Sequence, residues 1–211
     1  MSINHRSFSE QLHCPRIPVK EIALKEWDVV IQAMEAGQQV ILVRKGGLIE
    51  ETKDFRLEDT SFYLFPTFEH QKRELLKSAY GPALEHSLAQ ALESQRHVTI
   101  RSLAHVTDDI ELFDSFALKK LSPYHIFRDE YAEQRLNWQK NKPLHILIIR
   151  GYRLQSPVAI PVIPQYAGCK SWIRMESMIA DNDCIPILDD QEFHRKRLDI
   201  LRRLGVSGAE N

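Results

Sequence analysis

The sequence predicts an α+β fold, in which a small mixed sheet with barrel-like curvature is flanked by helices. One buried helical stripe precedes Gly37, at Trp27, Val30, Ile31 and Met34. Short apolar or alternating runs, typical of strands, follow at residues 39–44, 55–57, 62–65 and 97–106. Residues 144–154, LHILIIRGYRL, form the strongest strand pattern, and we expect this strand at the centre of the sheet.

Composition limits the class of protein. A chain of 211 residues is long enough for one domain with a real core. Its 28 Lys and Arg against 29 Asp and Glu give a formal net charge of −1, which lacks the strong basic excess of many nucleic-acid-binding proteins but permits a local basic patch. Three distant cysteines without a CxxC pair, no membrane-length apolar run and no signal-peptide core predict free thiols in a soluble, cytoplasmic protein.

The chain divides into three parts by pattern. Residues 1–18 are polar and end in prolines, which predicts a loosely ordered N-terminal arm. Residues 19–176 carry the strand and helix patterns of a single α+β domain. Residues 177–211 predict a C-terminal loop and a basic amphipathic helix, from about Asp190 to Leu204, packed on that domain.

Three further helix starts are predicted between these limits. Pro66 is expected to end a strand and Thr67 to cap a helix that continues past a break at Gly81-Pro82. Thr107-Asp108-Asp109 has the composition of a helix start. Ser122-Pro123 is a cap and first-turn pair for a helix that carries Phe127, Tyr131 and Trp138.

Several sequence blocks resemble a known family. They are ALKEW (23–27), VRKGG (43–47), FPTFEHQ (65–71), the run PYHI (123–126), LIIRGYRL (147–154) and YAGCKSW (166–172). Over residues 20–175 they resemble the bacterial domain-of-unknown-function family 1802. The resemblance implies no particular reaction, because the function of that family is not established.

The order of these parts is similar, more weakly, to PUA-like domains of the ASCH group. A tryptophan-bearing helix, a strand that ends in Arg and an apolar strand with Arg150 follow one another in the same order. The ASCH GxKxxExR block is not matched after Gly37. This similarity implies a small mixed β-barrel that binds RNA or modified nucleotides.

Polar side chains at the ends of the strand-like runs are the candidate ligand site. Arg44 and Lys45 precede Gly46-Gly47, where backbone N–H groups can face an anion, although a polar turn with solvated cations has the same sequence. The candidates at the expected helix start are Thr67, His70 and Gln71, which can bind an anion or only cap the helix. The candidates in the YAGCKSW block are Lys170, Ser171 and Trp172, which combine a cation with a stacking indole or belong to the core.

The final helix is a second candidate for contact with nucleic acid. Its cations are Arg195, Lys196, Arg197, Arg202 and Arg203. A basic amphipathic helix can contact phosphates, present a groove to a protein partner, or only solvate its outer face. We therefore expect a module that binds RNA, single-stranded DNA or a nucleotide, with no cofactor, no membrane partner and no assigned catalytic residue.

Two other classes of function stay open. Glu50, Glu51 and Lys53 have the spacing of half of a metal-dependent nuclease site, although such triplets are common by chance. His105, His125 and His145 are too far apart for usual zinc motifs, so no metal site is predicted. The third class is a regulatory, protein-binding domain without catalysis.

A cleavage assay separates the nuclease from the binding module. We expect no cleavage of RNA or DNA when Mg²⁺ or Mn²⁺ is added, because a turn after two glycines does not hold carboxylates within the tolerance of a metal site. Metal-dependent cleavage that disappears when Glu50 and Glu51 are both changed to Gln, with the fold intact, would instead establish the nuclease.

Overall fold

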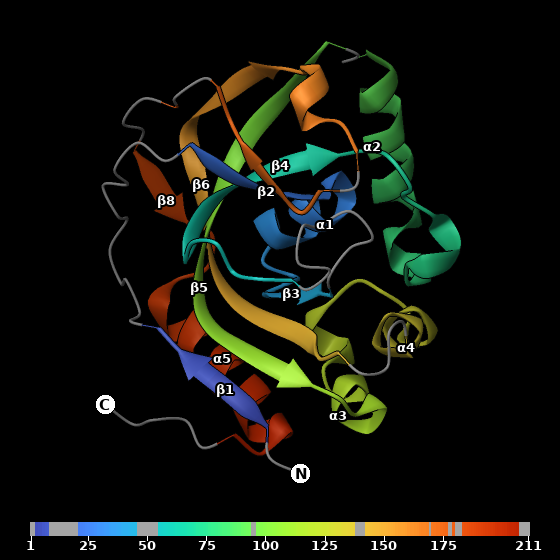
Figure 1. Cartoon of the computed structure of the whole chain (residues 1–211), viewed down its shortest axis with the longest axis vertical. Coiled ribbons are helices and arrows are strands. Elements are labelled where there is room, and N and C mark those ends of the chain that lie inside the picture. The colour runs from blue at the N-terminus through green and yellow to red at the C-terminus, as the bar shows by residue number, and fades with distance from the viewer. Residues whose placement is uncertain are drawn as a thin grey trace.

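One mixed sheet organises the chain, as the computed structural model in Figure 1 shows. The structure describes residues 3–8, 21–45, 55–93, 96–137, 142–168, 170–176, 179 and 183–206. Within these residues the strand order is β3-β6-β5-β4-β2-β7, with β1 paired to β5 and β8 paired to β6. The strands are β1 (Asn4–Ser7), β2 (Ile22–Trp27), β3 (Ile41–Arg44), β4 (Ser61–Thr67), β5 (His97–Leu112), β6 (Leu144–Pro161), β7 (Trp172–Arg174) and β8 (Cys184–Pro186).

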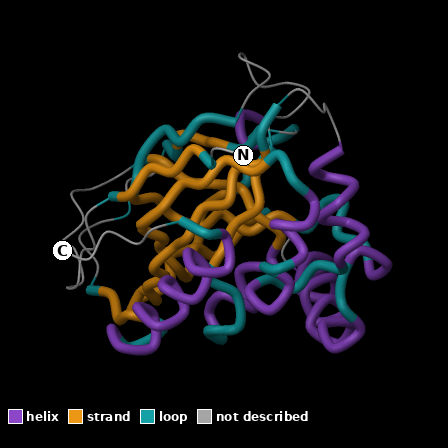
Figure 2. The backbone as a smooth tube through the Cα atoms, turned by 90° about the horizontal axis from the view of Figure 1, so that it is seen from below, coloured by secondary structure: helices purple, strands orange, loops and turns teal. Residues whose placement is uncertain are grey.

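Helices cover the sheet below and to one side, as Figure 2 shows. The α-helices are α1 (Asp28–Glu35), α2 (Gly81–Glu93), α3 (Ser115–Lys119), α4 (Asp129–Asn137) and α5 (Asp190–Leu204). Short 3₁₀ turns are η1 (Arg73–Leu75), η2 (Ser78–Tyr80), η3 (Ser122–Tyr124) and η4 (Pro164–Tyr166). The predicted α+β class, with a curved mixed sheet flanked by helices, is confirmed.

The hairpin of β5 and β6 is the backbone of the sheet. The two strands pair from His97↔Pro161 to Leu112↔Leu144, with register shifts at Ile100/Ser102 and Val106/Asp108. An extra residue in one strand bends it and increases its twist, and both strands sweep through the molecule as a curved pair in Figure 1.

The second register shift also changes which face each side chain occupies. Before it, Ala104 and Val106 belong to the apolar cluster that packs against α1. After it, Ile110 and Leu112 belong to the cluster that packs against α5 and α3. Because side chains alternate along a strand, one inserted residue moves the even-numbered positions from one face to the other.

The first and last helices form where the sequence predicts them. After α1, Gly37 has φ +69°, and a Cβ there would lie 2.6 Å from Leu188 Cδ2, so a side chain would be strained and crowded. The α5 helix matches its predicted range. Asp189 accepts a hydrogen bond from the Glu192 N–H, and Gly205 ends the helix in the left-handed conformation.

The predicted helix start at Thr67 is wrong. Pro66 and Thr67 are the last residues of β4, where Pro66 pairs with Glu26 of the parallel strand β2. His70 then has φ +63° in a turn. Within the continuously described residues 55–93, the first α-helix begins at Gly81, where the sequence predicted only a break. Ser122-Pro123 likewise forms only the turn η3, and α4 begins at Asp129.

Three other expectations need correction. Residues 4–7 of the predicted arm pair with β5 as strand β1, so this part of the arm is not loosely held. Cys184 is disulfide-bonded, so it is not the free thiol that we expected. Thr107-Asp108-Asp109 lies inside β5, and both carboxylates there are buried.

Basic side chains from α5 and β1 contact one of these carboxylates, Asp108. Arg197 of α5 holds Asp108 with two hydrogen bonds, of 2.6 and 2.9 Å, and His5 Nε2 lies 2.8 Å from the same carboxylate. Burial raises the pKa of Asp108, but hydrogen bonds from Arg197, His5 and Thr107 outweigh it, and the pKa falls below its ordinary value. The charged carboxylate therefore stabilises the fold above the ordinary pKa of Asp, and this contribution is lost as the pH falls.

Replacing Arg197 tests this network. Arg197→Ala leaves a buried carboxylate without its main partner, so we expect the free energy of unfolding to fall by about 3–5 kcal/mol in urea denaturation. The matched control, Arg195→Ala on the exposed face of the same helix, should change it by less than about 0.5 kcal/mol. A loss below about 1 kcal/mol for Arg197→Ala would contradict a structural role.

Candidate functional site

A cleft of about 570 Å³ opens at the carboxyl ends of β2, β3 and β4. These strands end in Trp27, Arg44 and Thr67, and all three residues line the cleft. Trp27 and Thr67 are register partners because β2 and β4 run parallel. The α4 helix together with Gly168, Lys170 and Ser171 supplies further parts of the wall. The cleft therefore joins segments that are far apart in the sequence.

The lining of this cleft, which we call the β-end cleft, is cationic. Six Lys or Arg and one His face three Glu among the described residues that line it. The basic residues are Lys25, Arg44, Lys45, His70, Lys72, Arg135 and Lys170, and the acidic ones are Glu26, Glu69 and Glu74. Of the basic residues, His70, Lys72 and Lys170 are exposed. An anion that enters the cleft meets a net positive field.

Three aromatic rings form an apolar wall in the same cleft. Trp27 and Tyr131 are stacked, with ring centroids 6.1 Å apart and planes inclined by 20°. Phe127 meets the edge of Trp27 at 5.7 Å and lies 4.9 Å from Tyr131. Trp27 and Tyr131 are only half-buried, so part of each ring is available to a ligand. Burial raises the pKa of Tyr131, which keeps its hydroxyl protonated.

Arg44 and Lys45 are fixed by the protein rather than extended into solvent. One Arg44 nitrogen donates to Lys25 O and to Glu26 Oε2, both at 2.8 Å, which ties β3 to β2. Lys45 is buried and donates to Leu136 O. Burial and then the nearby Arg135 charge lower the pKa of Lys45. Both cations contribute to the field of the cleft from its inner wall.

Of the residues expected at the helix start, the structure brings two into the cleft. Thr67 and His70 line it, on a strand end and a turn rather than at a helix N-terminus. Gln71 is buried elsewhere: it accepts from the Val29 N–H and donates to Ser87 Oγ, both at 3.1 Å. Since α1 has no side-chain cap of its own, Gln71 satisfies one of its first N–H groups. Gln71 is therefore structural.

Residues 170–172 divide between the cleft and the core. Lys170 and Ser171 line the cleft. Trp172 does not share this cleft with Arg44 and His70: its indole Nε1 donates to Arg56 O at 2.8 Å, and its ring packs on Phe55 and Phe62. The ligand-binding role expected of Trp172 stays a prediction, outside the β-end cleft.

Comparison with known proteins assigns the family. The sequence model for the domain of unknown function DUF1802 matches residues 23–198. The chain belongs to this family. No curated protein matches the chain. A mutant of ZmASCH from Zymomonas mobilis is a similar solved structure, with 9% identity, a TM-score of 0.37, and coverage of 87% of this chain and 99% of that one. A likeness at this TM-score carries no argument.

The β-end cleft of this DUF1802 protein contains residues that the sequence analysis did not select. Trp27 and Tyr131 were assigned to helix stripes, and Lys72 and Arg135 belong to no motif. The sequence signal for Trp27 is its place at the end of the ALKEW block. In the structure this residue lies directly beside Thr67, because β2 and β4 pair in parallel.

The basic residues of α5 are largely occupied within the protein. Arg197 is buried against Asp108, so its proposed contact with nucleic acid is not possible in this fold. Arg202 and Arg203 both pair with Asp199, and Lys196 lies 4.0 Å from Glu192. Arg195 is exposed. A nucleic-acid contact by this helix stays a prediction for Arg195, Lys196, Arg202 and Arg203.

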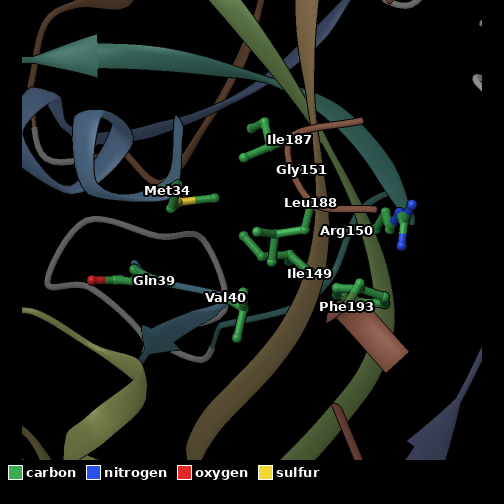
Figure 3. A pocket seen from close by; sticks show the side chains of 9 residues that line it. All are labelled: Met34, Gln39, Val40, Ile149, Arg150, Gly151, Ile187, Leu188 and Phe193. Atoms are coloured by element: carbon green, nitrogen blue, oxygen red, sulfur yellow. The ribbon is translucent and has the colours of Figure 1, made fainter. Parts of the chain in front are cut away.

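The part of the chain that the structure describes contains no metal centre. Glu50, Glu51 and Lys53 lie outside the described residues. No three His, Cys, Asp or Glu of the described residues lie close enough together to hold a metal ion. Within the same part, no helix is long and apolar enough to cross a membrane. The small pocket of Figure 3, beside Met34, Arg150 and Phe193, measures about 10 Å³, which is roughly the space of one water molecule.

The three candidate histidines lie in different surroundings. His105 Nδ1 lies 2.7 Å from Ser61 Oγ, and His145 Nδ1 lies 2.8 Å from Asp109. His125 is buried, and neither of its ring nitrogens has a partner among the described residues. Burial, and next the charge of Lys77, lower its pKa from the ordinary 6.5 to about 4.

This shift predicts a loss of stability in acid. The folded protein resists protonation of His125, so the unfolded chain binds a proton first as the pH falls below 6.5, and stability is lost down to about pH 4. Between pH 7 and pH 4.5 we expect wild type to lose about 2–3 kcal/mol more than His125→Phe in urea unfolding. The control His97→Asn, at an exposed site, should follow wild type. Equal losses in wild type and His125→Phe would contradict the prediction.

Proposed function

We propose that the β-end cleft binds a nucleotide unit, either free or within single-stranded nucleic acid. The observation that supports it is the presence of a half-exposed aromatic pair and an excess of cations in one cleft. Proteins that bind single strands combine these two features, because aromatic faces stack on bases while Lys and Arg follow the phosphates.

The cations of the β-end cleft differ in exposure, and we expect them to act on a ligand in two ways. Lys72 and Lys170 are exposed, so they can move to contact a phosphate directly. Arg44 and Lys45 are held by Glu26 and by backbone carbonyl groups, so they act through their charge on the inner wall. The proposed anion site therefore includes Lys72 and Lys170, from two other segments, in addition to Arg44 and Lys45.

The aromatic wall is suited to the base. A base stacked on the exposed part of Tyr131 or Trp27 would gain about 1–3 kcal/mol without any requirement for sequence. Thr67, His70 and Ser171 supply hydrogen-bonding groups beside it. This arrangement favours binding with little sequence specificity, and no reaction is assigned to it.

Titration of a fluorescent single-stranded RNA tests the proposal. The double variant Lys72→Ala, Lys170→Ala should weaken binding and reduce the slope of log K against log salt by about 1.4, because each contact with a single strand contributes about 0.7. The matched control Arg96→Ala, Lys120→Ala removes two exposed cations that do not line the cleft and should leave the slope unchanged.

Variants at Tyr131 separate stacking from charge in the same titration. Tyr131→Leu should cost about 1–3 kcal/mol of binding energy, whereas Tyr131→Phe retains the ring and should bind as wild type does. Binding by wild type that does not depend on salt, or equal binding by all of these variants, would overturn the proposal.

A further inference from the structure

A second basic cleft, of about 510 Å³, lies beside the ends of β1, β5 and β6. We call it the β1 cleft. Its lining contains two Arg, one Lys and one His against one Glu, and these residues are Arg6, Arg56, Glu111, Lys142 and His145. They come from four separate segments of the chain. An excess of cations in a second concave site is not required by the fold.

Two of these basic side chains, Arg6 and His145, are positioned by one buried carboxylate. Arg6 lies 2.5 Å from Asp109 Oδ2, and His145 Nδ1 lies 2.8 Å from Asp109 Oδ1. Asp109 is 1% exposed, while the Arg6 side chain is 54% exposed. Because Asp109 occupies Nδ1, Nε2 is the ring nitrogen of His145 that remains for a ligand.

The walls of the two clefts contact each other at two places. Arg44, in the wall of the β-end cleft, is the register partner of His145, in the wall of the β1 cleft. Ser171 lines the β-end cleft, and the next residue, Trp172, donates to Arg56 O and stacks on Phe55 of the β1 cleft. The clefts are therefore neighbours, separated by one pair of strands and one tryptophan.

The two clefts differ in what they offer a ligand. The β-end cleft presents half-exposed aromatic rings. In the β1 cleft, Phe55 is 3% exposed and is covered by Trp172 and His145, so it offers no free face for a base. Among the described residues that line it, the β1 cleft offers basic groups for a phosphate and no free Phe, Tyr or Trp face.

We infer that the two clefts form one track for a single strand of nucleic acid. The β-end cleft holds one nucleotide by its base, and the β1 cleft takes a backbone phosphate of a neighbouring nucleotide. A strand carries a phosphate at every nucleotide, so it can occupy both clefts, whereas a mononucleotide supplies one base and the phosphate attached to it. This inference rests on the proposed function and specifies an oligonucleotide as the ligand.

Binding of a mononucleotide and of an oligonucleotide to one variant tests the inference. Arg56→Ala, Lys142→Ala should bind UMP as wild type does, but should bind a single-stranded RNA octamer about tenfold more weakly, with a salt slope reduced by about 1.4. Arg56→Lys, Lys142→Arg should retain octamer binding, because both positive charges remain. The control Arg96→Ala, Lys120→Ala should match wild type for both ligands.

The possible outcomes separate the two proposals. If the octamer binds Arg56→Ala, Lys142→Ala as tightly as wild type, the track is overturned while the proposed function stands. If UMP and octamer weaken equally, the two clefts act as one site and the track is also overturned. If wild type binds neither ligand, the proposed function fails and the track fails with it. Circular dichroism and thermal unfolding establish that each variant is folded.

Discussion

Two adjacent buried carboxylates inside β5 constrain where the first strand and the last helix are placed. Asp108 and Asp109 are buried, and a buried charge without partners would cost several kcal/mol. Asp108 is paired with Arg197 of α5 and Asp109 with Arg6 of β1, while His5 of β1 contacts Asp108 and His145 of β6 contacts Asp109. The positions of the first strand and the last helix are therefore both coupled to one point of the central hairpin.

This coupling also explains why sequence analysis failed at these residues. Thr107-Asp108-Asp109 has the composition of a helix start, and the pattern contains no sign of partners 89 and 103 residues away. The register shift between Val106 and Asp108 also interrupts the alternation of apolar and polar residues by which a strand is recognised in the sequence. By contrast, every signal for α5 is local, from Asp189 at its cap to Gly205 at its end, and its range was predicted fully.

The same distinction applies to the candidate site. Arg44, Lys45, Thr67 and His70 stand at the ends of strand-like runs, a local signal, and the structure places all four in one cleft. The sequence could not rank their ability to bind a ligand, because that depends on the exposure of each side chain, and the exposure depends on α4 and on Gly168, Lys170 and Ser171. Trp27 shows the limit most clearly. It closes a strand, precedes a helix and lines a cleft, but its spacing identified only the helix.

A formal net charge of −1 is compatible with two basic clefts because acids and bases are not distributed alike. Asp28, Asp108 and Asp109 are each 1% exposed or less, and each is paired with a cation inside the protein. Their charges count fully in the sequence total but are compensated at short range, so they contribute little to the field that a ligand meets in solvent. Lys72, Lys170 and Arg56 are exposed, so their charges act on the solvent side of the clefts. The field at a cleft follows from its own lining rather than from the charge of the chain, and here the lining is positive at both.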